Sequence, residues 1–188
     1  MRNYLITISM IMLLSGCGSA PMNHDTVQAD SNSLEYSERV GLALYKATRF
    51  SAAKSDYTSR ELYLMDSSSS LQCEGEYTAV SISDVKSKFE NTYLLLLPQA
   101  DQGIQFGRHI RFRFDQGSND IVDATTSTKT CILVPVKGDG IPYVTHLLSE
   151  TPTEFHVFLS LYHETEIYIS TSIGLWRVRE GKISNVEA

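Results

Sequence analysis

Basic side chains alternate with apolar ones along residues 108–115, which read Arg-His-Ile-Arg-Phe-Arg-Phe-Asp. In an extended strand, His109, Arg111 and Arg113 share one face, and the apolar side chains between them share the other. Arginine binds carboxylate or phosphate in a bidentate manner, so the basic face could hold an anionic group. A solvent-exposed sheet face with acidic partners on the neighbouring strand explains the pattern more simply, and we expect that arrangement.

A second candidate surface surrounds the only tryptophan, Trp176, which is followed closely by Arg177 and Arg179. Tryptophan and arginine are enriched among the residues that dominate binding at protein interfaces. A single tryptophan can equally anchor the core of a sheet. Of these two alternatives we favour the core position for Trp176.

Several serine and carboxylate patterns could support catalysis. Ser51-Ala52-Ala53-Lys54 resembles the S-x-x-K nucleophile motif of penicillin-binding proteins and serine β-lactamases, but Ser83–Lys86 also fits this pattern. The companion S-D-N and K-T-G motifs are absent from the sequence, as is the G-x-S-x-G nucleophile elbow. The carboxylates Glu74 and Glu76 could form an acid–base pair, although such spacing is routine. We therefore predict no catalytic residue.

His156 and His163 lie seven residues apart and have glutamates nearby in the sequence, which raises the question of a metal site. We expect residues 154–162 to form a strand, on which an odd spacing places two side chains on opposite faces. The zinc motif H-E-x-x-H is absent. We therefore predict neither a metal ion nor another cofactor, and we expect His146 to be a structural histidine.

The first 16 residues have the composition of a secretory signal peptide. Arg2 precedes an apolar run at residues 4–14, which is shorter than the roughly 18–20 residues that a membrane-spanning helix needs. Leu14-Ser15-Gly16-Cys17 resembles the lipobox of bacterial lipoproteins, which has the form Leu-(Ala/Ser)-(Gly/Ala)-Cys. This resemblance implies cleavage before Cys17, a diacylglycerol on its sulfur and an acyl chain on the new amino group.

The same resemblance implies where the mature protein resides. Gly18, rather than aspartate, follows the lipidated cysteine, and this favours the outer membrane, with the folded part facing the periplasm. A diacylated cysteine anchors a protein stably to a membrane, because two acyl chains are buried. Residues 17–33 are rich in small and polar side chains and predict a flexible tether with a reach of roughly 20–25 Å. We expect residues 34–188 to form a single globular domain.

Two cysteines remain beyond the signal, Cys73 and Cys131. In an exported protein we expect them to form a structural disulfide, and two free thiols or a redox pair are the alternative. A bridge that closes about 58 residues would stabilise the fold by roughly 4 kcal/mol. The formal net charge of −6 argues against nonspecific nucleic-acid binding, which needs a basic surface.

The elements that must position these residues suggest an α+β fold. Apolar spacing predicts an amphipathic helix over residues 34–54, which we expect to pack on a predominantly antiparallel β-sheet. Residues 67–70 are four serines and predict a loop. A second, short helix is expected at residues 83–91, and the last expected strands form a C-terminal β-meander with turns at Gly174 and Gly181. The expected strands are residues 76–82, 92–98, 108–115, 130–136, 154–162, 166–172, 175–180 and 182–187.

These observations favour a non-enzymatic, membrane-anchored periplasmic lipoprotein that binds another protein of the envelope. One alternative is an immunity lipoprotein that neutralises a secreted toxin, which would fit the small size and the acidic charge. Another is a periplasmic hydrolase acting on cell wall or lipid, which would use the serine and carboxylate candidates.

Overall fold

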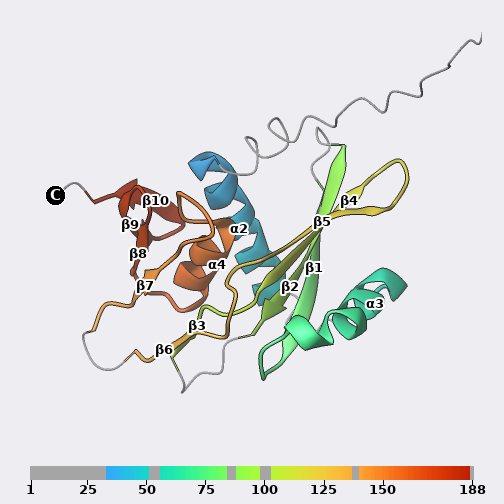
Figure 1. The fold of residues 1–188 in the computed structure, drawn as a ribbon, viewed down its shortest axis with the longest axis horizontal. Helices are drawn as coiled ribbons and strands as arrows, with labels where there is room; N and C mark the ends of the chain where they lie inside the picture. Colours follow the sequence, from blue (N-terminus) through green and yellow to red (C-terminus); the bar gives the residue numbers. More distant parts are fainter. Residues whose placement is uncertain (1–32, 51–55, 84–87, 98–102, 137–139, 187–188) are drawn as a thin grey trace, which may run out of the picture.

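The computed structural model describes residues 33–50, 56–83, 88–97, 103–136 and 140–186. These residues form an α+β fold, as the sequence predicts, with helices and antiparallel sheets stacked in layers (Figure 1). The described helices are α2 (Leu34–Phe50), α3 (Ser59–Ser67), the short 3-10 helix η1 (Ser69–Leu71) and α4 (Glu154–Tyr162).

The described strands pair into two four-stranded sheets and one two-stranded sheet. The N-terminal sheet has the order β1-β2-β4-β5 and is antiparallel throughout. The C-terminal sheet has the order β10-β9-β8-β7, in which β7 runs parallel to β8. The strands are β1 (Tyr77–Ser83), β2 (Phe89–Leu96), β3 (Ile104–Gln105), β4 (Ile110–Asp115), β5 (Ile121–Thr126), β6 (Leu133–Val134), β7 (Tyr143–Thr145), β8 (Ile167–Thr171), β9 (Gly174–Arg179) and β10 (Lys182–Asn185).

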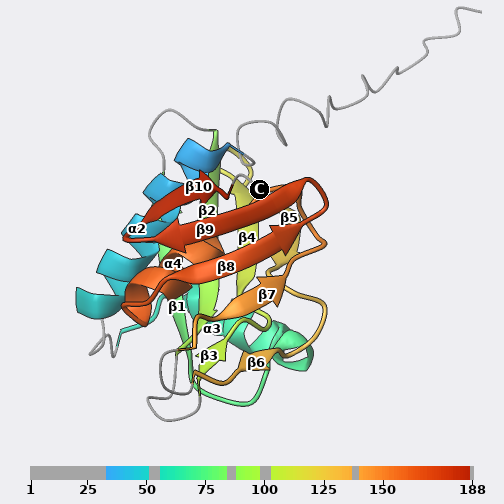
Figure 2. The same ribbon diagram turned by 90° about the vertical axis from the view of Figure 1, so that its left-hand side faces the viewer.

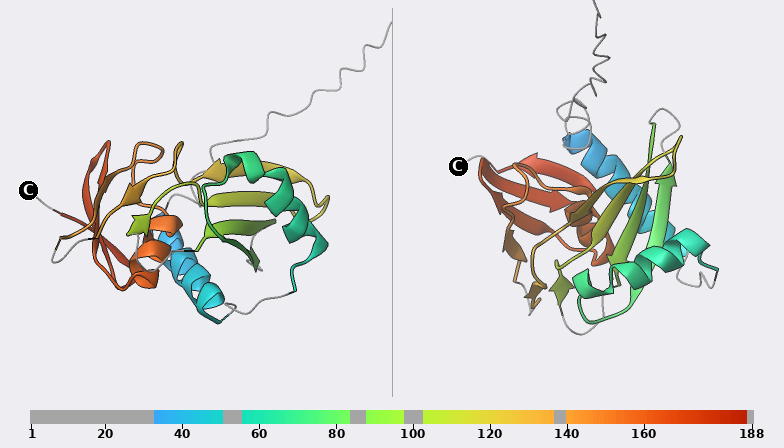
Figure 3. Two further views of the ribbon diagram at one scale, coloured as in Figure 1. Left: turned by 90° about the horizontal axis from the view of Figure 1, so that it is seen from below. Right: turned by 45° about the vertical axis from the view of Figure 1, so that its right-hand side comes forward.

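The helices α2 and α4 pack against each other between the two larger sheets (Figure 1). One hydrophobic core therefore joins side chains of α2, α4, the inner face of the C-terminal sheet and one face of the N-terminal sheet. A second core lies on the other face of the N-terminal sheet, where α3 crosses the strands (Figure 3). Both faces of the N-terminal sheet are thus covered.

A close approach between α2 and α4 explains the glycine in the middle of α2. A Cβ atom at Gly41 would lie 2.5 Å from the Cβ of Val157 and 2.7 Å from the carbonyl oxygen of Glu154. Glycine lowers helix propensity by about 1 kcal/mol relative to alanine. Its lack of a side chain is what lets the two helices touch.

Residues 154–162 form the helix α4, so the predicted strand there is wrong. Every residue from Glu154 to Ser160 is buried, because α4 lies between two sheets. A helix buried on all sides has no polar face, so its sequence carries no helical period and reads like a buried strand.

Other expected elements also differ from the structure. Ser83 ends β1 and Phe89 begins β2, so the two strands form a hairpin where a short helix was expected, with residues 84–87 outside the described part. The four serines continue α3 and begin η1 rather than forming a plain loop. Of residues 130–136, only Leu133–Val134 is a strand.

The C-terminal meander is confirmed for β8, β9 and β10, which follow one another as antiparallel neighbours (Figure 2). The predicted disulfide between Cys73 and Cys131 is also confirmed, with a Cα–Cα distance of 5.8 Å. It ties the segment before β1 to the segment before β6. None of the described helices has the length and apolar character that crossing a membrane requires.

Candidate functional site

A cleft opens between the neighbouring strands β4 and β5 of the N-terminal sheet and the segment that leads into α4. It has a volume of about 380 Å³ and is lined by residues of β4, β5, the segment after β7 and the first turn of α4. Cavities of about 300–1,000 Å³ accommodate small-molecule ligands. The polar side chains around it include Arg111, Arg113, Thr125, His146, Ser149 and Glu154.

The floor of the cleft is an ion pair between Arg111 of β4 and Glu154 of α4. Arg111 Nη1 lies 3.1 Å from Glu154 Oε1, and Glu154 is 2% exposed. Arg111 Nη2 also donates to Thr125 Oγ1 at 3.4 Å and lies 3.8 Å from Asp123 Oδ2. Burial works to lower the pKa of Arg111, but the carboxylate of Glu154 and its other neighbours hold that pKa above its usual value. Arg111 is therefore a fixed, permanently charged group.

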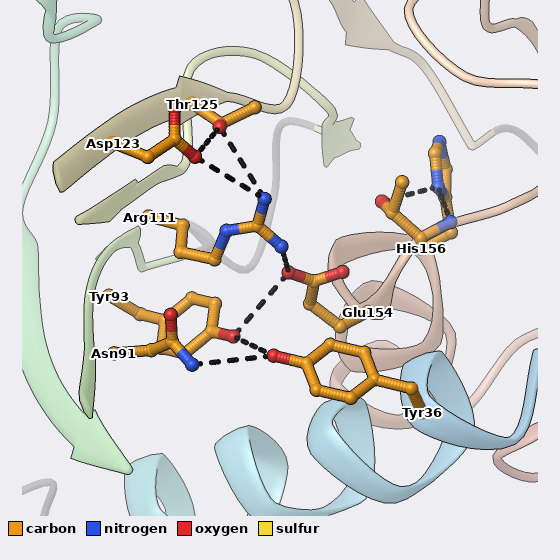
Figure 4. A network of polar contacts seen from close by, with 9 residues as sticks. Tyr36, Asn91, Tyr93, Arg111, Asp123, Thr125, Glu154 and His156 are labelled. Carbon is orange, nitrogen blue, oxygen red and sulfur yellow. Dashed lines mark hydrogen bonds and ion pairs between the residues drawn. The ribbon is translucent and has the colours of Figure 1, made fainter. Parts of the chain in front are cut away.

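This ion pair belongs to a longer polar network that reaches α2 and β2 (Figure 4). The hydroxyl of Tyr93 donates to Glu154 Oε1 at 3.5 Å and lies 3.4 Å from the hydroxyl of Tyr36. Asn91 donates to the Tyr36 hydroxyl at 3.4 Å. Burial, together with the charge of Glu154, raises the pKa of Tyr93 well above its usual value, so its hydroxyl stays protonated. The network links five elements, α2, β2, β4, β5 and α4, and holds Glu154 in place.

Arg113 lies next to this network on β4 but does not join it. It is 7% exposed and lines the cleft, and its guanidinium lies 5.7 Å from the ring centroid of Phe89. Asp123 is its register partner across β4 and β5, yet that carboxylate accepts from Thr125 and faces Arg111 instead. Within the described part of the chain, the Arg113 guanidinium has no hydrogen bond or ion pair.

His146 and His156 meet at the inner end of the cleft. Their ring centroids are 4.7 Å apart, and His156 Nδ1 accepts the backbone N–H of Thr153 at 3.0 Å. Thr153 is the N-cap of α4, so this bond fixes the start of the helix. Burial lowers the pKa of both histidines, so both rings are neutral at neutral pH. His146 Nε2 is buried and has no partner among the described residues.

His109 is completely buried and lies behind the cleft, just before β4. Its Nδ1 accepts the backbone N–H of Leu96 at 3.1 Å, and its Nε2 donates to the carbonyl oxygen of Gln105 at 3.2 Å. Its ring stacks on that of Phe155 at 5.7 Å. Burial lowers the pKa of His109 to about 4, although the bond to Gln105 acts in the opposite direction. This histidine is a neutral part of the core.

The basic face of residues 108–115 is thus not the exposed surface that the sequence suggested. Its three side chains point toward α4 and the cleft, because α4 covers this face of the N-terminal sheet. The structure brings Arg111 and Arg113 together in one cleft. His109 lies apart from them in the core.

The second candidate surface is split by the alternation of β9. Trp176 is 7% exposed and lies in the core, as we favoured, and its Nε1 donates to Thr171 Oγ1 at 2.9 Å. Arg177 and Arg179 lie on the opposite, exposed face of the C-terminal sheet. These three residues therefore do not form one surface.

The catalytic candidates lie away from the cleft or outside the described residues. Ser51–Lys54 falls outside the described part of the chain, and so does Cys17. Glu74 and Glu76 are exposed beside the disulfide. His156 lies on α4 and His163 caps its C-terminus, so a helix, not a strand, sets their relation. No group of three histidine, cysteine or acidic side chains within the described residues is placed to hold a metal ion.

Sequence reasoning missed the acidic and hydroxyl groups of the cleft. In the sequence, Glu154 is only a neighbour of His156 on an expected strand, and Thr125 and Asp123 lie on a segment with no expected element. A usable signal was present at Thr153, a helix N-cap residue type followed directly by an acidic side chain. Recognising that start would have placed Glu154 in the first turn of a helix.

Comparisons with known proteins give no family for this chain. No protein-family model, no curated protein and no solved structure matches it.

Proposed function

We propose that the chain is a lipid-anchored protein of the bacterial envelope whose folded part binds a ligand in the cleft. The observation that carries the binding function is Arg113. This arginine is almost fully buried, carries a permanent charge and has no polar partner among the described residues, yet it lines an open cleft. Among the described residues, none of its guanidinium nitrogens is both buried and unpartnered, so they reach the open cleft, where an anionic ligand group can pair with them.

The rest of the cleft also favours binding over turnover. Arg111 and Glu154 hold each other at 3.1 Å, and His156 is engaged by the backbone of Thr153. Groups that are fixed in advance lose little freedom when a ligand arrives, which favours affinity. Leu148, which is 43% exposed, lines the cleft and provides apolar surface beside its polar side chains.

Support for the anchor comes from the sequence around Cys17 and from the disulfide. The Leu-Ser-Gly-Cys segment at residues 14–17 has the lipobox form. Disulfides persist in oxidising compartments such as the bacterial periplasm, and the Cys73–Cys131 bridge fits that location. Outer-membrane attachment through Cys17, a periplasmic position of the fold and an envelope protein as the source of the ligand are parts of this proposal.

The anchor is tested by metabolic labelling with an alkyne analogue of palmitate, followed by fractionation of the membranes. The natural chain should be labelled and should sediment with the outer membrane, and the Cys17→Ser variant should lose the label. A Cys17→Ser chain that still incorporates the analogue would contradict the proposed anchor.

The binding function is tested by native mass spectrometry of the full chain extracted from cell envelopes. The natural chain should carry a bound species that leaves on mild activation, and the Arg113→Gln variant should carry much less of it. Arg177→Gln is the matched control, because Arg177 is an exposed arginine on the outer face of β9. Equal occupancy of the Arg113→Gln and natural chains would place the ligand elsewhere.

A further inference from the structure

We infer that the cleft takes a ligand with a single carboxylate, held by Arg113, beside neutral hydrogen-bonding groups that face His146 and the hydroxyls of the cleft. This inference rests on the proposed function and names the chemical class of its ligand. A peptide with a free C-terminus and a sugar acid share this chemistry.

The two arginines of the cleft differ in their partners. Arg111 has Glu154 at 3.1 Å and Asp123 at 3.8 Å, so its charge is already balanced. Asp123 accepts from Thr125 Oγ1 at 2.9 Å and lies 3.8 Å from Arg111, and it forms no ion pair with Arg113 within the described residues. The guanidinium of Arg113 is therefore left to an anion from outside the protein. Its planar fork of N–H donors matches a carboxylate.

The remaining charges limit the ligand to one negative charge. Asp123 and Glu154 already lie inside the cleft, and Glu150 lines it at an exposed position. The lining thus holds three carboxylates against two arginines, and a dianionic phosphate would add two further negative charges to it. Like charges at short distance repel strongly in a site partly shielded from water. A singly charged carboxylate fits this balance better.

The part of the ligand next to its carboxylate should be neutral and polar. His146 is 4% exposed, lines the cleft and has a buried Nε2 without a partner among the described residues. Ser149 and Thr151 line the same wall. A neutral imidazole and hydroxyl groups on this wall match a ligand hydroxyl or amide rather than a second charge.

Calorimetric titration of the full chain in detergent tests this inference with two matched pairs of probes. One pair is N-acetyl-L-alanyl-L-alanine and its C-terminal amide, and the other is D-glucuronate and D-glucuronamide. At least one acid should bind with one-to-one stoichiometry, and its amide should bind about 10- to 100-fold more weakly, because the bond to a charged group is lost. The pair that responds identifies a peptide end or a sugar acid as the source.

Three variants locate the carboxylate. Arg113→Gln should weaken binding of the acid about 10- to 100-fold and bring it to the level of the amide. Arg113→Lys keeps the charge but lacks the planar fork of donors, so its affinity for the acid should lie between the affinities of the natural chain and of Arg113→Gln. Arg177→Gln should bind like the natural chain. Circular dichroism verifies that each variant is folded, and the comparison of acid with amide on the natural chain needs no variant.

The outcomes separate this inference from the proposed function. Equal binding of an acid and its amide would overturn the carboxylate inference and leave a ligand-binding cleft in place. Acid binding that survives Arg113→Gln unchanged would overturn the role of Arg113. Failure of both acids to bind at millimolar concentration would also overturn the inference. The proposed function is tested separately, by the palmitate label and by the bound species in native mass spectrometry.

Discussion

Replacing Gly41 with alanine should change the free energy of unfolding in two opposite ways, through helix propensity and through packing, and the structure predicts that packing is the larger effect. Gly41 lies inside α2, where alanine would favour the helix by about 1 kcal/mol. A Cβ atom at this position would lie 2.5 Å from the Cβ of Val157 and 2.7 Å from the carbonyl oxygen of Glu154. Carbon atoms in good contact are about 3.5–4.0 Å apart. The two helices would therefore have to separate by about 1 Å.

That separation is resisted on both sides, because α2 and α4 lie between the two larger sheets. Adding a methyl group to a well-packed core costs about 1–3 kcal/mol, and contact with backbone atoms that cannot rotate away puts Gly41→Ala at the upper end of that range. After the propensity gain of about 1 kcal/mol is subtracted, we expect a net destabilisation of about 2 kcal/mol.

Urea unfolding of the oxidised chain at neutral pH, followed by circular dichroism, measures this difference. The double variant Gly41→Ala, Val157→Ala removes only the contact with the Val157 Cγ1 at 2.7 Å, and it should recover a small part of the loss relative to the sum of the single variants. Most of the loss should remain, because the Cβ at position 157 and the carbonyl oxygen of Glu154 stay in place. A Gly41→Ala chain that is as stable as the natural one, or more stable, would refute the account of the helix contact.

Three further predictions concern the buried groups. The folded-state pKa of His109 is about 4, against 6.5 when unfolded, so the unfolded chain binds a proton first as the pH falls. His109 alone should therefore remove about 3 kcal/mol of stability between pH 6.5 and pH 4, in addition to the losses from His146 and His156, whose pKa values burial also lowers. Urea unfolding of His109→Asn should show a pH dependence that is weaker than that of the natural chain by about this amount. Glu154→Gln leaves Arg111 without its main partner and should cost about 3 kcal/mol in the same assay, whereas Glu154→Leu combined with Arg111→Met should cost less than the sum of the single changes. Replacing Cys73 and Cys131 together with serine should lower the free energy of unfolding by about 2–5 kcal/mol, and an unchanged urea midpoint would argue against a structural bridge.

Sequence reasoning succeeded where one face of an element is exposed. The strands β8, β9 and β10 alternate between buried and exposed positions, and glycines in the left-handed region support their turns, as at Gly181 with φ of 79°. The helix α2 likewise has an exposed face and follows the helical period. In both cases the spacing of polar residues on the exposed face indicates the secondary structure.

It failed where an element is buried on all sides or is too short to show a period. Because α4 is buried on all sides, its sequence shows no helical period. The alternation of basic and apolar residues on β4 predicted an exposed face, but α4 covers that face. Thr58 is the N-cap of the short helix α3. Its hydroxyl accepts the backbone N–H of Glu61, and the Glu61 carboxylate accepts the backbone N–H of Thr58. This S/T-x-x-E pattern was visible in the sequence and would have revealed the helix.

The cleft could not be derived from the sequence for a related reason. Arg111 and Arg113 were recognised as a pair that could bind an anion, but their neighbours come from β5, the segment after β7 and α4. Assigning α4 as a strand placed Glu154 in the wrong layer. Only the tertiary arrangement shows that Arg111 is paired and Arg113 is not.

Nuclear magnetic resonance of the isotope-labelled full chain tests the central claim most directly, because it reports where a ligand binds. On addition of N-acetyl-L-alanyl-L-alanine or D-glucuronate, we predict that the side-chain Nε–Hε signal of Arg113 and the backbone amide signals of Thr125 and Thr151 shift together. The corresponding signals of Arg177, on the outer face of β9, should stay in place. Shifts confined to the region of Arg177, or no shift of the Arg113 signal with either probe, would contradict the account.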